Sequence, residues 1–437
     1  MDRFLIKHLL SVEASPFGAG LLSKLDRRIC HPERYIQAAN LLVTNILIYG
    51  NVRVSKSNNF YSIPNRYKPE YFARTYVLTM LNLLVKLGYV NELKGFYNRT
   101  TGTGKRTIIS PTEKLIDEFD TLTIGRNKPK EVIELRDSNK KLIDYQETDL
   151  IKRMRNETHS INEAIGNVKI DFLLPINKLK NAATFNSLSI FTPFTLFPYS
   201  TLPLITNPKE YISTRNTHPL HALRQSLKKI RIQSIFTGFK RVFNNGNFNC
   251  GGRFYDVGFF SYQTLKSELR GLILIEGTPV IELDFGNMFP LMLYHKQGLN
   301  FEGDVYQIEG YKRSDVKLAL NVMLNAKSKD STLKRLRLDG VDNPKELLFA
   351  IEYKHEPLIK YLYSGVAVEL MKIESEILTD ILLTMIAEDI IPLPIHDSLL
   401  VKDLVKETKT LNGVMINSYK KKFEFVPVIK NKVYHRN

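Results

Sequence analysis

Two aspartates stand at the ends of apolar segments, where a carboxylate is unusual. Residues 279–284 (PVIELD) predict a buried strand that ends at Asp284, and residues 391–402 (IPLPIHDSLLVK) predict a strand, a tight turn at Asp397 and a second strand. A carboxylate among apolar residues costs free energy unless a partner compensates its charge. We therefore expect the two aspartates to share a cation site. The alternative is a pair of unrelated aspartates in surface loops.

Magnesium suits such a pair, because it prefers oxygen ligands and retains several of its water molecules. Two Mg²⁺ ions at Asp284 and Asp397, or Mn²⁺ in their place, would align a 3′-hydroxyl with a nucleoside triphosphate and neutralise the leaving pyrophosphate. The carboxylate pair therefore favours nucleotidyl transfer. A metal-dependent nuclease uses the same paired carboxylates and is the main alternative.

A helix pattern lies between the two aspartates, at residues 312–327. Four of its polar residues recur at every fourth position and so share one stripe: Arg313, Lys317, Asn321 and Asn325. Arginine and lysine side chains in such a stripe suit the binding of a triphosphate. A nuclease would not need this stripe, but a solvated helix face would have the same pattern.

The order of these motifs resembles that of family A DNA polymerases and phage-type single-subunit RNA polymerases. The matching segments are IELDFGNMF, an RxxxK helix, HDS and, upstream of these, GGRFY, and the likeness covers about residues 240–405. The resemblance implies a right-hand palm with helical fingers. It implies that Asp284 and Asp397 are the catalytic metal ligands, and that Arg313 and Lys317 hold the triphosphate.

Two departures from those families concern the nucleotide. The DNA enzymes have an aromatic residue and a Tyr-Gly pair along the fingers helix, whereas Asn321 and Asn325 fall near those places here. The DNA enzymes also have a Glu five residues after the first Asp, whereas this chain has Phe289. A bulky Phe289 would exclude a 2′-hydroxyl, which favours deoxynucleotides, although HDS and GGRFY are closer to the RNA enzymes. We assign Asn321 and Phe289 to nucleotide binding.

The resemblance also implies contacts with a primer-template. Arg253 and Tyr255 of the GGRFY segment, together with Arg270, are expected to contact primer, template or nucleotide. His396 is expected to position the primer end. Glu374 and Glu376 lie on a predicted core helix at residues 364–386, where they either support the residues of the site or, as we expect, are solvated acids. Asp304 and Tyr306 precede the fingers helix, where they either shape the nucleotide pocket or form a turn.

A basic segment precedes and includes the GGRFY motif. Residues 211–255 contain eight Lys and Arg and no Asp or Glu. Helical spacing would place Leu220, Leu223, Leu227 and Ile230 on one face and the basic residues Arg224, Lys228 and Arg231 on another. Such a basic face favours contacts with the nucleic-acid backbone, and a solvated basic face is the alternative.

The first 125 residues predict a helix at 36–49, a second at 70–88, a β-hairpin whose turn is at 99–104, and a last helix at 112–120. This order resembles a winged helix-turn-helix. We expect the second helix to enter the DNA major groove and the wing to contact the backbone. The basic residues of the wing are Arg99, Lys105 and Arg106. A winged helix used for protein contacts, or as a scaffold, is the alternative.

The composition agrees with a nucleic-acid partner. The formal net charge is +17 and the isoelectric point is about 9.5, which favours a polyanion. The two cysteines, Cys30 and Cys250, form no CxxC pair, so we expect neither a zinc cluster nor a disulfide framework. Residues 181–208 carry no charge, but four prolines interrupt them and make a spanning helix unfavourable. We expect no signal peptide, no membrane partner and a cytoplasmic location.

We thus expect an α+β protein in which an N-terminal winged helix-turn-helix precedes a right-hand polymerase-like palm with helical fingers. The expected division is a DNA-binding domain at 1–125, a linker and thumb-like helical region at 126–215, and palm and fingers at 216–437. The expected function is template-directed nucleotidyl transfer with two Mg²⁺ ions, on DNA (duplex or primer-template) and nucleoside triphosphates, in plasmid, phage or mobile-element replication. The alternatives are a metal-dependent nuclease and a non-catalytic DNA-binding replication initiator.

Overall fold

The computed structural model mixes helices and strands, in agreement with the expected α+β class. It describes residues 3–4, 14–25, 29–97, 100, 104–119, 121–124, 130–172, 229–232, 238–257 and 261–434. The uncharged segment at 181–208 therefore lies outside the described residues.

The chain divides into two compact units whose segments alternate in sequence. The first unit is Met1–Val132, Lys169–Gly238 and Asp256–Gly277, and the second is Ile133–Val168, Phe239–Tyr255 and Thr278–Asn437. Each unit is described by itself. The expected domain boundaries at 125 and 215 stay predictions.

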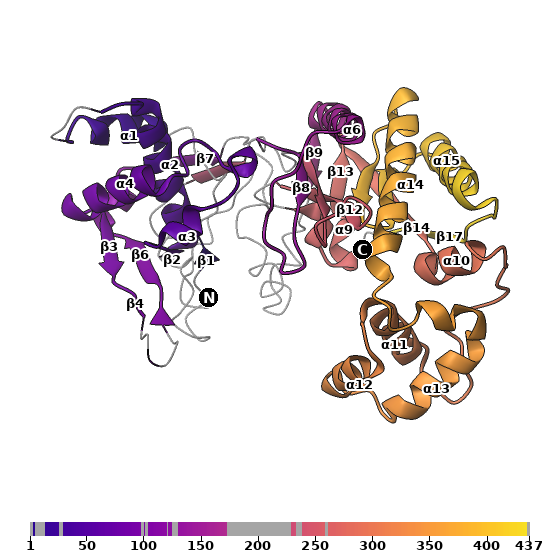
Figure 1. Cartoon of the computed structure of the whole chain (residues 1–437). Helices are drawn as coiled ribbons and strands as arrows, with labels where there is room; N and C mark the ends of the chain where they lie inside the picture. Colours follow the sequence, from indigo (N-terminus) through magenta and orange to yellow (C-terminus); the bar gives the residue numbers. More distant parts are fainter. Residues whose placement is uncertain are drawn as a thin grey trace, which may run out of the picture. The chain divides into compact units, whose positions relative to one another are not determined.

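The N-terminal part of the first unit is a helical layer with a small sheet (indigo and purple in Figure 1). Its helices are α1 (Ala14–Leu22), α2 (Pro32–Tyr49), α3 (Asn58–Tyr61), α4 (Arg74–Lys86) and α5 (Glu113–Asp117), with the 3-10 helix η1 (Asn65–Tyr67). The sheet has the order β1 (Arg3–Phe4), β2 (Val52–Val54), β6 (Thr107–Pro111) and β3 (Val90–Leu93). The short strands β4 (Phe96–Tyr97) and β5 (Gly104–Lys105) extend the β3–β6 hairpin.

Local sequence explains these elements. Pro32 begins α2, because proline at the first helical position loses no hydrogen bond. Gly88 follows α4 with φ at 75°, a left-handed conformation that glycine adopts without steric cost. Helix α2 packs against α1 and α4, and its residues 38–47 are all buried, Leu42 and Ile46 completely. The predicted helices at 36–49 and 70–88 and the predicted hairpin are thus confirmed.

The rest of the first unit contains two strand pairs. Strand β7 (Thr121–Ile124) pairs in parallel with β10 (Lys229–Ile232), and β9 (Ile170–Phe172) pairs antiparallel with β13 (Ile273–Ile275). The 3-10 helix η4 (Tyr262–Thr264) and the short helix α9 (Ser267–Arg270) precede β13. The predicted helical face through Ile230 and Arg231 is wrong at these residues, because the alternation Lys-Ile-Arg-Ile has the period of a strand.

The second unit is built around strand β14 (Thr278–Phe285). It pairs antiparallel with β16 (Ser398–Lys402) and with β17 (Ile429–Lys432), and β15 (Leu393–Ile395) pairs with β16. Helix α15 (Val405–Phe423) packs on β14 and β16, and α14 (Ala367–Ala387) lies beside α15 (Figure 1). Helix α10 (Met288–His295) follows β14 directly.

A second group of strands in this unit packs on α14. It consists of β8 (Ile133–Leu135), β11 (Phe239–Phe243) and β12 (Gly251–Asp256), in the order β12-β11-β8, with helix α6 (Asp149–Gly166) against β8, β11 and α14. Residues 173–228 lie outside the described part of the chain, so the predicted thumb-like region stays a prediction.

A helical group separates α10 from α14 in the sequence (orange, below α14 in Figure 1). It consists of α11 (Arg313–Asn325), α12 (Lys329–Leu338), α13 (Pro344–Lys354) and the 3-10 helix η5 (Glu356–Tyr361). Helix α11 packs against α12, α13 and α14. The predicted helix at 312–327 is thus confirmed, and Val316, Leu320 and Met323 form its buried side.

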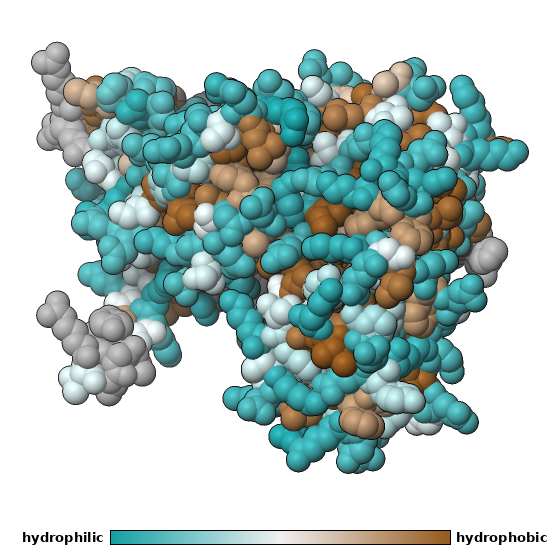
Figure 2. Space-filling view, turned by 45° about the vertical axis from the view of Figure 1, so that its right-hand side comes forward, coloured by the Kyte–Doolittle hydropathy of each residue, from teal (hydrophilic) through white to brown (hydrophobic). Residues whose placement is uncertain are grey.

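Hydrophilic side chains predominate on the face shown in Figure 2, with smaller groups of apolar side chains between them. Within the described residues, none of the helices has the length and apolar character that crossing a membrane requires.

Candidate active site

Asp284 and Asp397 lie at the same edge of the sheet in the second unit. Asp284 is in register with Ser398, and the Phe285 backbone N–H donates to the Asp397 carbonyl oxygen at 3.1 Å. His396 and Asp397 form the two-residue turn between β15 and β16, and His396 adopts a left-handed φ of 55°. Such a conformation costs free energy in a residue other than glycine, and it places the Asp397 turn directly beside the end of β14.

The two carboxylates influence each other. The pKa of Asp284 is raised to about 7, mainly by burial and further by the charges of Asp397 and Glu282, while Lys317 and Lys430 oppose the rise. Negative charges held close together in a partly buried place are costly until a cation approaches. The aspartates that the sequence singled out therefore lie in one electrostatic environment.

The donor set fits a hard divalent cation, because it offers carboxylate oxygens and no thiolate. Among the described residues, no group of three or more His, Cys, Asp and Glu side chains is arranged to hold a metal ion. A magnesium ion at Asp284 and Asp397 would thus complete its coordination with water or with substrate oxygens.

Glu282 is a buried acid that the sequence reasoning missed. It accepts a hydrogen bond from Ser398 Oγ at 2.7 Å and another from the Tyr434 hydroxyl, and 4% of its surface is exposed. Because Glu282 lies two residues before Asp284 in a strand, both side chains are on one face of β14. This spacing in the sequence could have identified Glu282. Ser398 of the HDS motif thus holds the turn strand against the strand that carries Asp284.

Arg313 and Lys317 project from α11 around Tyr306. The Arg313 guanidinium binds both oxygens of Asp304, with Nε–Oδ2 at 2.5 Å and an Nη2–Oδ1 distance of 3.2 Å, and it lies 5.2 Å from the Tyr306 ring centroid. Lys317 Nζ lies 5.9 Å from the same centroid. The hydrogen bond from Arg313 is the main cause that lowers the pKa of Asp304. Asp304 and Tyr306 therefore organise the cationic stripe.

The other residues of the stripe lie farther along α11. Asn325 Nδ2 donates to the Asn321 carbonyl oxygen at 2.8 Å, within the last turn of the helix. Asn321 is half-buried and Asn325 is exposed. The assignment of Asn321 to the nucleotide stays a prediction.

Arg253 forms a buried ion pair with Glu374 of α14. The distances are 2.7 Å for Nε–Oε1 and 2.5 Å for Nη2–Oε2, and 1% of the Glu374 side chain is exposed. The expectation that Glu374 is solvated is wrong, because it lies four residues after Leu370 on the buried side of α14. Burial raises the pKa of Glu374 to about 7, and the Arg253 charge opposes this rise.

Two aromatic contacts complete this side of the site. The Arg253 guanidinium lies 5.5 Å from the Phe289 ring centroid, so a residue assigned to the primer-template contacts one assigned to the nucleotide. The Tyr255 and His396 ring centroids lie 6.2 Å apart in an edge-on arrangement. The GGRFY segment and the HDS turn, far apart in sequence, are thus neighbours.

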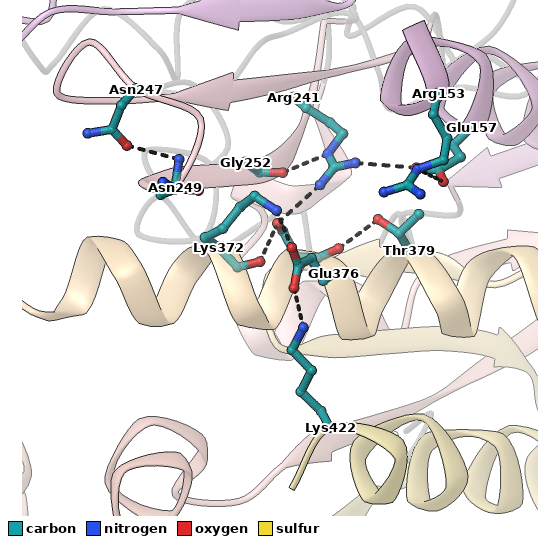
Figure 3. Close-up of polar contacts among 11 residues, drawn as sticks. Arg153, Glu157, Arg241, Asn247, Asn249, Gly252, Lys372, Glu376, Thr379 and Lys422 are labelled. Atoms are coloured by element: carbon teal, nitrogen blue, oxygen red, sulfur yellow. Dashed lines mark hydrogen bonds and ion pairs between the residues drawn. The ribbon is translucent and has the colours of Figure 1, made fainter. Parts of the chain in front are cut away.

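A buried arginine fixes α14 against β11 and β12 (Figure 3). Arg241 donates to the Gly252 carbonyl oxygen at 3.0 Å and to Ser375 Oγ at 3.2 Å, and burial lowers its pKa to about 10. A Cβ on Gly252 would lie 2.8 Å from Ser375 Oγ, and its φ is 88°. The second glycine of GGRFY therefore permits the close approach that places Arg253 beside Glu374.

Glu376 also differs from the expectation of a simple solvated acid. It is partly exposed and accepts hydrogen bonds from Lys372 and from Lys422 of α15, the latter at 2.6 Å (Figure 3). The contact with Lys422 links α14 to α15.

The remaining predicted residues lie elsewhere or outside the described part. Arg270 is in the first unit, where its Nε donates to the Leu265 carbonyl oxygen at 3.3 Å. Arg231 lies in β10, and Arg99, Arg224 and Lys228 are outside the described residues. Lys105 and Arg106 are exposed in the β3–β6 hairpin region, with the Arg106 guanidinium 5.8 Å from the Phe60 ring centroid.

Comparisons with known proteins give a weak structural likeness. No family model matches the chain, and no curated protein matches its sequence. A solved structure, the POL domain of Pol1 from M. smegmatis in complex with a DNA primer-template and dNTP, is similar with a TM-score of 0.32 and 11% identity. The match covers 64% of this chain and 63% of that chain. The functional argument therefore depends on the residues themselves.

Proposed function

We propose that this chain is a template-directed nucleotidyltransferase, and a DNA polymerase rather than an RNA polymerase. One observation carries the proposal: the HDS turn and the end of β14 bring Asp284 and Asp397 side by side, and the fingers-like helix α11 presents Lys317 to Asp284. Paired carboxylates and an adjacent cation are what a metal-assisted attack on a triphosphate requires.

The residues have distinct roles in this proposal. Asp284 and Asp397 would hold two Mg²⁺ ions, which Mn²⁺ can replace and which would promote attack by the 3′-hydroxyl and stabilise the leaving pyrophosphate. Lys317 and Arg313 bind the triphosphate through charge-assisted hydrogen bonds. Asn321 and Phe289 contact the nucleotide. The primer end lies toward Arg253, Tyr255 and His396.

The N-terminal part of the first unit would dock on duplex DNA as a winged helix-turn-helix. Its order of helix, strand, helices and hairpin supports this assignment. Helix α4 would enter the major groove, and the wing residues Arg99, Lys105 and Arg106 would contact phosphates. The basic residues Arg224, Lys228, Arg231 and Arg270 would contact the primer-template backbone. A polymerase loaded at a specific site suits plasmid, phage or mobile-element replication.

Primer extension tests the proposal. The purified protein with Mg²⁺ and a labelled primer-template is supplied with dNTPs, with NTPs or with no nucleotide. We expect extension with dNTPs, loss of extension in Asp284→Asn and Asp397→Asn, and normal extension in Asp330→Asn, which changes an exposed acid on α12.

The other outcomes identify the alternatives. Metal-dependent shortening of the primer in all three reactions, lost in the same two variants, would identify a nuclease. Salt-sensitive DNA binding without either reaction would identify a non-catalytic initiator.

A further inference from the structure

The C-terminal strand β17 places a lysine opposite the first aspartate. Strand β17 pairs with β14 on the side away from β16, and Lys430 is in register with Asp284. Asp284 thus has the HDS turn on one side and Lys430 on the other. No motif in the sequence marks position 430, and the register of this strand depends on the fold.

The lysine side chain crosses the end of β14 at a glycine. A Cβ built on Gly286 would lie 3.0 Å from Lys430 Cε and 3.0 Å from Val428 Cγ1. The Gly286 backbone N–H donates to the Val428 carbonyl oxygen at 2.8 Å, which fixes the two chains at this point. Glycine at this position therefore leaves room for the lysine stem beside the carboxylate edge.

The ammonium group of Lys430 acts on both carboxylates that border the α11 stripe. Its charge opposes the rise in the pKa of Asp284 and contributes to the lowering of the pKa of Asp304. Within the described part of the chain, the Lys430 ammonium has neither a hydrogen bond nor an ion pair, and the residue is exposed. Arg313 differs, since Asp304 already binds it.

Three cations from two elements therefore lie near Asp284 or Asp304. Arg313 and Lys317 belong to α11, and Lys430 belongs to β17. Cations that converge from separate elements beside a carboxylate edge favour a ligand with several negative charges. A single surface carboxylate would leave most of this positive charge uncompensated.

We propose that Lys430 binds the polyphosphate of the incoming nucleoside triphosphate, together with Arg313 and Lys317 of α11. This inference rests on the proposed function and adds to it a contact from the C-terminal strand. The partner is a triphosphate, and not the primer-template backbone, because Lys430 lies in register with Asp284, which is assigned to the metal ions that a triphosphate would contact.

The test compares Lys430→Ala, Lys430→Arg and the matched control Lys432→Ala. Lys432 lies in the same strand, in register with Glu282, and its ammonium lies 5.2 Å from the Tyr434 ring centroid. The measurements are the Kd for dATP on a primer-template with a blocked 3′ end, the KM for dATP, kcat and the Kd for the primer-template alone.

We expect Lys430→Ala to weaken dATP binding and to raise the KM for dATP about 10- to 100-fold, because one hydrogen bond between charged groups is lost. Inhibition by pyrophosphate should weaken in parallel. Lys430→Arg should recover most of the affinity, Lys432→Ala should match the wild type, and the primer-template Kd should not change. Because Lys430 is exposed, all variants should unfold at the wild-type temperature.

The contrary outcomes separate the two proposals. If the wild type extends primers and Lys430→Ala keeps the wild-type Kd and KM for dATP, the role of Lys430 is wrong and the proposed function stands. The same holds if the variant loses affinity only for the primer-template. If the wild type neither extends primers nor binds dATP, the proposed function fails, and the Lys430 inference fails with it.

Discussion

Two arginine–carboxylate pairs border the candidate site, and they differ mainly in burial. Arg253–Glu374 and Arg313–Asp304 both have two hydrogen bonds, and the shortest distance is 2.5 Å in each. The Glu374 side chain is 1% exposed, whereas those of Arg313 and Asp304 are 43% and 35% exposed. The same pair of chemical groups therefore has a different environment on each side of the site.

The difference in burial implies a difference in use. Breaking a buried pair leaves an uncompensated charge in a poorly solvated place, so Arg253–Glu374 holds a fixed geometry. An exposed pair contributes little net free energy, so a substrate anion can displace Asp304 from Arg313 at small cost. We infer that the Arg253 side of the site is a scaffold and that the Arg313 side exchanges ligands.

Removal of the buried acid should have the largest effect on stability. Glu374→Ala should lower the free energy of unfolding by about 3–5 kcal/mol, because Arg253 is left without its partner. Urea denaturation followed by circular dichroism measures this. Glu369→Ala, an exposed acid on the same helix, should change the free energy by less than about 0.5 kcal/mol.

An apolar replacement of the whole pair sharpens the argument. Arg253→Met combined with Glu374→Met should lose less stability than the sum of the two single changes, since neither charge is then left buried alone. Equal losses in Glu374→Ala and Glu369→Ala would show that the pair is not a scaffold.

A buried histidine, His355, holds the exposed Arg313 side of the site in place, and its contribution to stability should depend on pH. His355 is fully buried; its Nε2 lies 2.9 Å from the Val305 carbonyl oxygen, and its Nδ1 lies 2.8 Å from the Tyr294 hydroxyl. A neutral ring satisfies both contacts by donating to the carbonyl and accepting from the hydroxyl. Burial lowers the pKa of His355 from 6.5 to about 4. The ring thus holds the segment that carries Asp304 and Tyr306.

The sign of the effect follows from proton binding. Between pH 6.5 and about 4, the unfolded chain is protonated at His355 and the folded chain is not, so stability falls as the pH falls. Nothing is lost above pH 6.5, where the ring is neutral in both states, and the loss of stability amounts to about 3 kcal/mol at pH 4, on the order of the pKa difference converted to free energy. His355→Gln should remove this part of the dependence of the free energy of unfolding on pH, as urea titrations at several pH values would show. An unchanged pH dependence would contradict the role of His355.

The sequence predicts the parts of the site that local patterns determine. The apolar run before Asp284, the two-residue turn at His396 and the period of α11 all depend on neighbours in sequence, and the structure has each element where it was predicted. The Arg241 and Gly252 contacts explain the glycine directly before Arg253, but the motif alone did not indicate them.

The missed residues depend on faces and registers that the sequence leaves open. Glu374 is an acid on a mostly apolar helix, and only the contact of α14 with Arg253 of β12 shows that it is buried. Lys430 acquires its position from the pairing of β17 with β14, more than a hundred residues away in sequence. Long-range packing determines both positions.

The smallest expected effect belongs to the exposed pair, and it concerns affinity rather than stability. Asp304→Asn should leave the free energy of unfolding within about 1 kcal/mol of the wild type, because both groups of the pair are solvated. The KM for dNTP should fall by up to about 5-fold, since the triphosphate no longer competes with a carboxylate for Arg313. Steady-state primer extension at constant ionic strength measures this.

The neighbouring helix α12 offers a matched control for that change. Arg335 binds Asp339 at 2.7 Å in a pair with an exposed arginine, as Arg313 binds Asp304. Asp339→Asn should leave both stability and KM unchanged, because that pair is not part of the cationic stripe. If Asp304→Asn instead raises KM, Asp304 orients Arg313 for the substrate and does not compete with it. The Arg313 side would then be a scaffold like the Arg253 side, and the distinction between the two pairs would fail.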